Sequence, residues 1–155
     1  MTVRVRVIGV GQRERGDDAA GLLLADHFRD VAPDNISVLI GAADAASLLA
    51  QFEGFRAVIV VDCARGGGAP GSILRLPADF AASPGPRAKS SHGNALADAM
   101  ALGAALGCLP PRLSVFAVVG ERFGLGEPLS PAVAAALPDL AALVLREAAA
   151  MWCCP

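Results

Sequence analysis

The sequence predicts an α/β fold with a mostly parallel sheet, covered by helices on both faces and carrying one antiparallel edge strand. Three observations support this prediction. Five runs typical of strands alternate with four helical patterns along the chain. The run AVIVV is continuously apolar, as expected of a central strand that is buried on both sides. The run GSILRL follows the strand before it after only RGGGAPG, without an intervening helix, which predicts an antiparallel edge strand.

In the first half of the chain, three strand-like runs enclose two helical patterns. VRVRVIGV, NISVLI and RAVIVVD are the strand-like runs, and DDAAGLLLADHFRDV and DAASLLAQFEG are the helical patterns. The predicted strands are 3–10, 35–40 and 56–62, and the predicted helices are 17–31 and 44–54. Asp17 or Asp18 can cap the first of these helices, because a carboxylate accepts the free amides of a first turn.

In the second half, the predicted strands are 71–76 and 112–120, and the predicted helices are 91–107 and 130–152. Ser90 or Ser91 can cap the helix at 91–107. Ser130 followed by Pro131 fits an N-cap with proline at the first helical position. Pro138 inside the last pattern predicts a kink or a break that would divide it into two helices.

Length and composition predict a single domain over residues 1–155 with one substantial core. The apolar fraction is 54% and the mean hydropathy is +0.52, but no run approaches the roughly 18 uncharged apolar residues of a membrane span. MTVRVRVIGVG lacks the pattern of a signal peptide, so we expect a soluble cytoplasmic protein without a membrane partner.

Charge and cysteine usage agree with that expectation. Thirteen basic and fifteen acidic residues give a net charge of -2, and no basic patch with interleaved aromatic residues favours nucleic acid. The four cysteines lack C-x-x-C spacing, and in a cytoplasmic protein they are expected to be free thiols: Cys63, Cys108, Cys153 and Cys154.

The stretch GVGQRERGDDAAG, residues 9–21, combines a glycine turn with two adjacent acids. Glycines directly after a strand suggest a phosphate-binding loop. However, the third glycine of a GxGxxG motif is replaced by Glu14, and Gly16 is followed by Asp17 instead of the lysine of a Walker loop. Negative charge at the place of a phosphate is unfavourable without a metal, so the sequence disfavours a nucleotide site.

Polar residues recur in the loops at the predicted carboxyl ends of strands. The acidic pair Asp17 and Asp18 follows the first strand, Asp62 closes the run AVIVVD, and His92 follows the long loop 77–91. Because ligands of a parallel α/β sheet bind at this edge, the topology can bring these residues together. Carboxylates and one imidazole suit a borderline divalent ion such as nickel or zinc.

Each of these residues also has a simpler structural interpretation, and the sequence alone does not decide between the two. Asp17 and Asp18 can be helix caps, Asp62 can bond loop amides across RGGG, and His92 can be a solvated first-turn histidine. His27 fits a surface or satisfied core position. No GxSxG elbow supports a serine nucleophile, and Cys63 fits the core better than a nucleophile.

Four motifs, in order along nearly the whole chain, resemble those of one family. They are VIGVGQRERGDDAAG, VIVVDCARGGGAPGSI, SSHGNALADAMALGAAL and GLGEPLSPAVAAALP. The set resembles the hydrogenase maturation proteases, the nickel-dependent C-terminal endopeptidases of NiFe-hydrogenase large subunits. The resemblance implies a three-layer α/β/α fold around a twisted five-stranded sheet, which agrees with the number of predicted strands. It also implies that Asp18, Asp62 and His92 are the metal ligands and the catalytic residues.

The resemblance further implies a division of labour between protease and substrate. The nickel belongs to the large-subunit precursor and serves to recognise it, with zinc or another divalent ion as a possible surrogate. The protease then removes a short C-terminal extension. Nickel held between the two proteins could polarise the scissile carbonyl or activate water. Two alternatives stay open, namely a non-catalytic assembly chaperone of the same fold and a hydrolase that binds its own zinc.

Three departures from the family pattern are visible. Gln12 replaces the asparagine after GxG, and the charged Arg13-Glu14-Arg15 replaces an apolar spacer. Gly41-Ala42-Ala43-Asp44 stands where many members have an Asp-Gly-Gly-Thr turn, which the resemblance implies helps to choose the substrate. These departures predict that the chain differs from its relatives in what it recognises.

Overall fold

The computed structural model describes residues 4–77, 89–90 and 95–153. The strands are β1 (Val5–Gly9), β2 (Ile36–Ile40), β3 (Ala57–Arg65), β4 (Ile73–Leu76), β5 (Lys89–Ser90) and β6 (Arg112–Gly120). The helices are the 3-10 turn η1 (Gly16–Ala19) and the α-helices α1 (Ala20–Val31), α2 (Ala45–Ala50), α3 (Ala95–Leu106) and α4 (Pro131–Cys153). In the described part of the chain, no helix is both long and apolar enough to cross a membrane.

The sheet has the predicted mixed character. Its strand order is β2-β1-β3-β6-β4, in which β1 pairs in parallel with β2 and β3, and β3 pairs in parallel with β6. β4 pairs antiparallel with β6 at the edge, which confirms the interpretation of GSILRL. The short strand β5 was not predicted, and it pairs antiparallel with the carboxyl end of β3.

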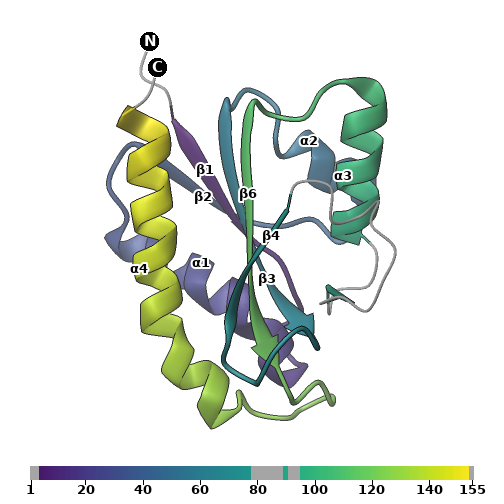
Figure 1. The fold of residues 1–155 in the computed structure, drawn as a ribbon, viewed down its shortest axis with the longest axis vertical. Coiled ribbons are helices and arrows are strands. Elements are labelled where there is room, and N and C mark those ends of the chain that lie inside the picture. Colours follow the sequence, from purple (N-terminus) through teal and green to yellow (C-terminus); the bar gives the residue numbers. More distant parts are fainter. Residues whose placement is uncertain (1–3, 78–88, 91–94, 154–155) are drawn as a thin grey trace.

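Helices cover the sheet on both faces, as Figure 1 shows with α4 on one side and α2 and α3 on the other. One apolar cluster joins α1 and α4 to alternate residues of the central strands, including Ile59 and Val61. A second cluster joins α2 and α3 to the intervening residues, including Val58 and Val60. This alternation identifies the face toward which each side chain of β3 points.

β3 extends further than the predicted strand 56–62, so Asp62 lies inside β3 instead of closing it. The physical reason is pairing on both sides of its last residues. Ala64 pairs with Val119 of β6 and with Ser90 of β5, and Arg65 likewise has partners in both strands. By alternation with Val58 and Val60, the Asp62 side chain points to the face that carries α2 and α3.

α4 is one continuous helix, so the prediction of two helices divided at Pro138 was wrong. Pro138 lies on the exposed face, where water can hydrate the carbonyl group that the missing N–H leaves without its helical partner. Val133, Ala136 and Leu140 form a buried stripe that continues past the proline on the same face. Packing against the sheet therefore keeps α4 helical on both sides of the proline.

The helix starts agree only partly with the predictions. The N-cap of α1 is Ala19, which makes no side-chain capping bond, and the Asp17 carboxylate instead accepts amides from the loop before α4. Ser130 caps α4 as predicted, because its Oγ accepts a hydrogen bond of 3.4 Å from the Val133 amide. Ser90 lies in β5, and Ser91 lies outside the described residues.

Candidate active site

The carboxyl end of β1 and its partner Val61 in β3 meet the first turn of α1 at one edge of the sheet. A Cβ on Gly21 would lie 2.4 Å from the Val61 carbonyl oxygen and 2.6 Å from that of Val10, so only glycine allows this approach. Asp18 lies three residues before Gly21 in η1, and Asp62 directly follows Val61. The close helix–strand contact therefore brings Asp18 and Asp62 to the same edge.

Both carboxylates are buried, with 2% of Asp18 and 1% of Asp62 exposed to solvent. Gly11 adopts a φ of +145°, and a Cβ on it would lie 1.9 Å from the Asp18 carbonyl oxygen. The glycine turn therefore folds directly onto Asp18. Asp62 accepts a hydrogen bond of 2.7 Å from the Cys63 amide. Buried carboxylates held at the carboxyl edge of a sheet are suited to metal binding or to general acid–base chemistry.

Asp17 has a different environment from its neighbour. One carboxylate oxygen accepts the amides of Glu121 and Arg122 at 2.8 and 3.0 Å, and the other accepts the Ser130 amide at 2.7 Å. Burial alone would raise the pKa of this carboxyl, but the three backbone donors outweigh it and lower the pKa below its ordinary value. The interpretation of Asp17 as a helix cap was therefore wrong, since it ties η1 to the loop before α4.

Further contacts join this loop, residues 121–130, to the glycine turn. The Asp17 amide donates to the Arg122 carbonyl at 2.8 Å, and the Gly126 amide donates to the Glu14 carbonyl at 2.7 Å. The Arg65 guanidinium, at the end of β3, lies 4.1 Å from the centre of the Phe123 ring. The loop therefore forms one wall of the edge at which Asp18 and Asp62 lie.

The charged spacer that departs from the family pattern is anchored as well. The Arg13 guanidinium forms a bidentate ion pair with Asp26 of α1, with N–O distances of 2.5 and 3.0 Å. Arg13, Glu14 and Arg15 are all exposed. The spacer thus presents charged side chains to solvent while its backbone and one guanidinium hold it in place.

His92 lies outside the described residues, so its predicted position as a ligand stays a prediction. Among residues 4–77, 89–90 and 95–153, no three His, Cys, Asp or Glu side chains gather in a way that could hold a metal ion. His27 is exposed on α1 and packs beside Phe28, as expected of a surface residue.

Cys63 is buried next to Asp62 and points to the opposite face of the sheet. Its Sγ and the Asp17 Cβ lie 2.7 and 2.8 Å from the point where a Cβ on Gly120 would sit. Cys63 therefore fits a packed core position, as predicted. Within the described part of the chain Cys63, Cys108 and Cys153 form no disulfide, as predicted, and Cys154 lies outside it.

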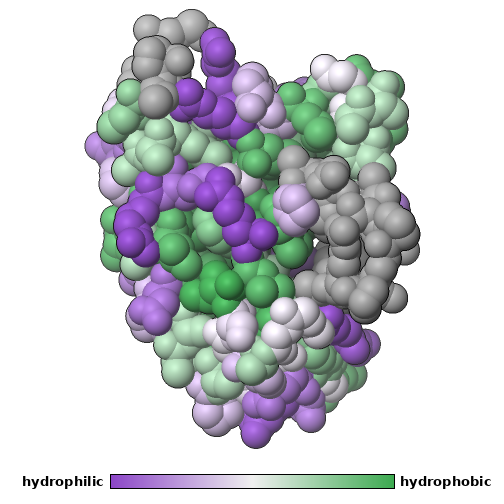
Figure 2. All heavy atoms as spheres, in the orientation of Figure 1, coloured by the Kyte–Doolittle hydropathy of each residue, from purple (hydrophilic) through white to green (hydrophobic). Residues whose placement is uncertain are grey.

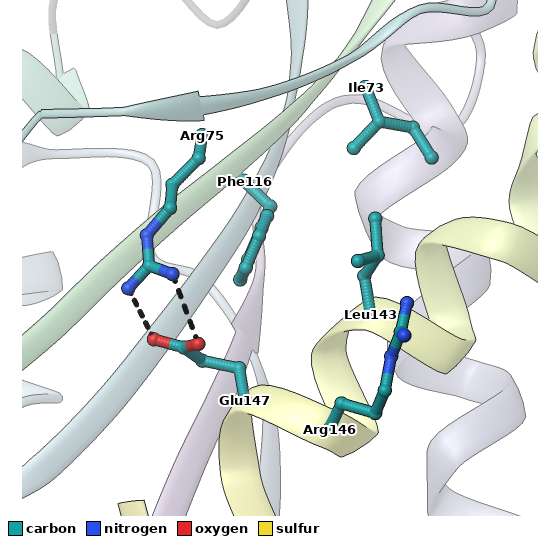
Figure 3. A pocket seen from close by; sticks show the side chains of 6 residues that line it. All are labelled: Ile73, Arg75, Phe116, Leu143, Arg146 and Glu147. Atoms are coloured by element: carbon teal, nitrogen blue, oxygen red, sulfur yellow. Dashed lines mark hydrogen bonds and ion pairs between the residues drawn. The ribbon is translucent and has the colours of Figure 1, made fainter. Parts of the chain in front are cut away.

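A groove of about 340 Å³ lies between β4, β6 and α4. Figure 2 shows apolar surface framed by hydrophilic side chains on this side of the molecule. In Figure 3, the Arg75 guanidinium forms two contacts with the Glu147 carboxylate across it. Phe116 in its wall belongs to the apolar cluster of α1 and α4, on the opposite face of the sheet from the Asp62 side chain. The groove is therefore separate from the edge with the two buried carboxylates.

Comparison with known proteins shows which sequences and folds this chain resembles. Residues 23–147 match the family model described as hydrogenase maturation protease. The chain is 28% identical over 148 residues to the hydrogenase expression/formation protein HupD of Rhodobacter capsulatus, covering 93% of this chain and 70% of that protein.

Solved structures show the same fold. The hydrogenase maturating endopeptidase HybD from E. coli superposes with a TM-score of 0.78 at 24% identity, over 92% of this chain and 90% of that chain. The NiFe-hydrogenase maturation protease HybD from Thermococcus kodakarensis has a TM-score of 0.77 at 20% identity, over 94% and 99% of the two chains. Together with the family match, these findings show that the chain belongs to the hydrogenase maturation protease family.

Proposed function

We propose that this chain is the endopeptidase that removes a C-terminal extension from a nickel-loaded NiFe-hydrogenase large-subunit precursor. The observation that carries the proposal is the pair of buried carboxylates, Asp18 and Asp62, at the edge where β1, β3 and α1 meet. Family membership supports the reaction type, since the family consists of proteases. The relative HupD bears a name that refers to hydrogenase formation, which supports the substrate class.

The nickel in this proposal belongs to the substrate. Asp18 and Asp62 supply carboxylate oxygens and His92 supplies an imidazole nitrogen, a donor set that suits nickel and would also accept zinc. Bound nickel would supply Lewis-acid polarisation of the scissile carbonyl or of a water molecule. The residues of this chain recognise the metal-bearing precursor and orient its C-terminal segment, and a carboxylate at this edge is available to accept a proton.

His92 receives indirect support from its described neighbours. Ser90, two residues earlier in the chain, pairs with Ala64, which lies two residues after Asp62 in β3. α3 begins at Ala95, three residues after His92, and packs on the face toward which Asp62 points. The chain before His92 thus pairs with β3 close to Asp62, and the chain after it packs on the face toward which Asp62 points.

The direct test incubates the purified protein with nickel-loaded precursor and follows the mass of the precursor. We expect the wild type to remove a C-terminal peptide, and we expect Asp62→Asn and His92→Ala to abolish this processing with little loss of stability. Although Asp62 is buried, asparagine has almost the same size and keeps an oxygen for the Cys63 amide. His27→Ala is the matched control for the histidine, and Asp139→Asn, an exposed acid of α4, is the control for the carboxylate. Normal processing by Asp62→Asn or His92→Ala would contradict the assignment of the ligands.

Two other results, one from this incubation and one from metal analysis of the purified protein, would favour the alternatives. An intact precursor that co-purifies with the wild-type protein would indicate an assembly chaperone. Stoichiometric zinc that stays with the purified protein through dialysis would indicate a hydrolase with its own metal. We also propose that the protein acts in the cytoplasm as one domain, which the three free thiols of the described residues support.

A further inference from the structure

The loop between β2 and α2, residues 41–44, lies beside the glycine turn at the carboxyl edge of the sheet. The Gly41 amide donates a hydrogen bond of 2.8 Å to the Gly9 carbonyl at the end of β1. A Cβ on Gly41 would lie 2.4 Å from the Val10 Cγ1. Because parallel strands end at the same edge, the loop is next to the strand end that leads into Asp18.

The loop offers few side chains that could hold it in one conformation. Its sequence is Gly41-Ala42-Ala43-Asp44, and the Asp44 carboxylate accepts the Ser47 amide at 2.8 Å as the N-cap of α2. The one polar side chain of the loop is therefore engaged by the helix. A defined conformation of the first three residues needs an anchor from another part of the chain.

Gln51 supplies that anchor through both ends of its carboxamide. Its Oε1 accepts the Ala42 amide at 2.8 Å, and its Nε2 donates to the Ile40 carbonyl at 3.0 Å. The side chain thus bonds one donor and one acceptor of the backbone, as a neighbouring strand would. Gln51 is half-buried at the C-terminus of α2, so these bonds are partly shielded from water.

Gln51 is itself held by Arg6 of β1. The Arg6 guanidinium donates to the main-chain carbonyl of Gln51 at 2.9 Å and lies 3.8 Å from the centre of the Phe55 ring. It also donates to the Ser37 Oγ at 3.4 Å. Arg6 thus joins β1 and β2 to the main chain of Gln51, and the Gln51 carboxamide joins that residue to the loop.

We propose that Gln51 is a positioning residue that holds residues 41–43 of the loop as an uncharged wall of the substrate site. The inference rests on the proposed function, since it assigns the loop a role in binding the precursor beside Asp18 and Asp62. A preset loop lowers the conformational entropy that substrate binding must remove. With alanines at its centre, the wall contacts an extended precursor segment through main-chain groups and small apolar surface.

The test compares Gln51→Ala and Gln51→Glu with Glu53→Ala, an exposed position two residues away. Gln51→Ala removes both bonds, and we expect the KM for nickel-loaded precursor to rise about 5–10-fold while kcat changes less than about 2-fold. Gln51→Glu keeps the acceptor for Ala42 and loses the donor to Ile40, so its KM should lie between those of wild type and Gln51→Ala. Amide hydrogen exchange at Ala42 should accelerate about 10-fold in Gln51→Ala alone.

An unchanged KM in Gln51→Ala, or a loss in kcat without a change in KM, would overturn the proposal. Unchanged hydrogen exchange at the Ala42 amide in Gln51→Ala would overturn the claim that Gln51 anchors the loop. A wild-type protein that binds the precursor without cleaving it contradicts the proposed function instead. In that case the Kd of the precursor replaces KM, and the same ordering of the three variants is expected. A wild type that neither cleaves nor binds the precursor overturns both.

Discussion

Asp17 and Asp18 are adjacent and of the same residue type, yet their carboxylates have different surroundings. Asp17 accepts three backbone amides from the loop before α4, whereas Asp18 belongs to the turn that folds against Gly11. Three donors stabilise the ionised form of Asp17 and connect η1 to a loop more than 100 residues away. Asp17 therefore supports the architecture of the edge, and Asp18 is the acid of this pair to which we assign the proposed chemical role.

This difference predicts a pH-dependent loss of stability in Asp17→Asn. Because the folded-state pKa of Asp17 is lowered, its ionised form contributes stability above the unfolded pKa of about 3.9, and this contribution is lost as pH falls below that value. An amide at this place cannot accept all three backbone donors. We expect the variant to be less stable by about 2–3 kcal/mol near pH 7, with the difference shrinking below about pH 4, in urea unfolding measured from pH 7 to pH 3.

Asp139→Asn is the control, because this exposed acid should change the unfolding free energy by less than about 0.5 kcal/mol at any of these pH values. If Asp17→Asn were as stable as the wild type at pH 7, the three amide bonds would not be a significant source of stability. A constant difference across the pH range would show that ionisation of Asp17 is not the cause.

At the scale of elements, α4 shows how tertiary packing overrides a local signal. Pro138 removes one helical hydrogen bond and crowds the preceding turn. The helix nevertheless continues, since its buried stripe from Val133 to Met151 packs on one side of the sheet. The proline thus lowers the stability of α4 without ending it.

Pro138→Ala should therefore stabilise the protein. The new N–H group can bond the Ala134 carbonyl, and the steric conflict of the ring disappears, while part of the gain is offset by a more flexible unfolded chain. We expect the free energy of unfolding to rise by about 1–2 kcal/mol, as measured by urea denaturation. Ala142→Ser, another exposed position of α4, is the control for an ordinary surface change. A less stable Pro138→Ala would mean that the proline is required for the course of the helix.

The elements that the sequence predicted well are those with a strong local pattern. The continuous apolar run of β3 and the short RGGGAPG connection to β4 were sufficient to predict a central strand and an antiparallel edge. The role of Asp17 could not be predicted, because its partners lie far away in sequence and bind through backbone amides, which leave no residue-type signal. The two-residue strand β5 is too short for any periodicity.

At the scale of the whole molecule, two apolar layers and the mixed sheet leave one edge where several loops meet. The glycine turn brings Asp18, β3 brings Asp62, and Gln51 holds the neighbouring loop 41–44. The loop 121–130 closes another side through Asp17. These contacts hold three loops at the edge where we propose that the metal-bearing precursor is recognised.

The central claim is that this edge recognises nickel carried by the large-subunit precursor. The most direct measurement compares nickel-loaded and nickel-free precursor, incubated with the wild-type protein, by intact mass over time. The account predicts loss of the C-terminal peptide from the nickel-loaded precursor and an intact nickel-free precursor. Equal cleavage of both forms would contradict it.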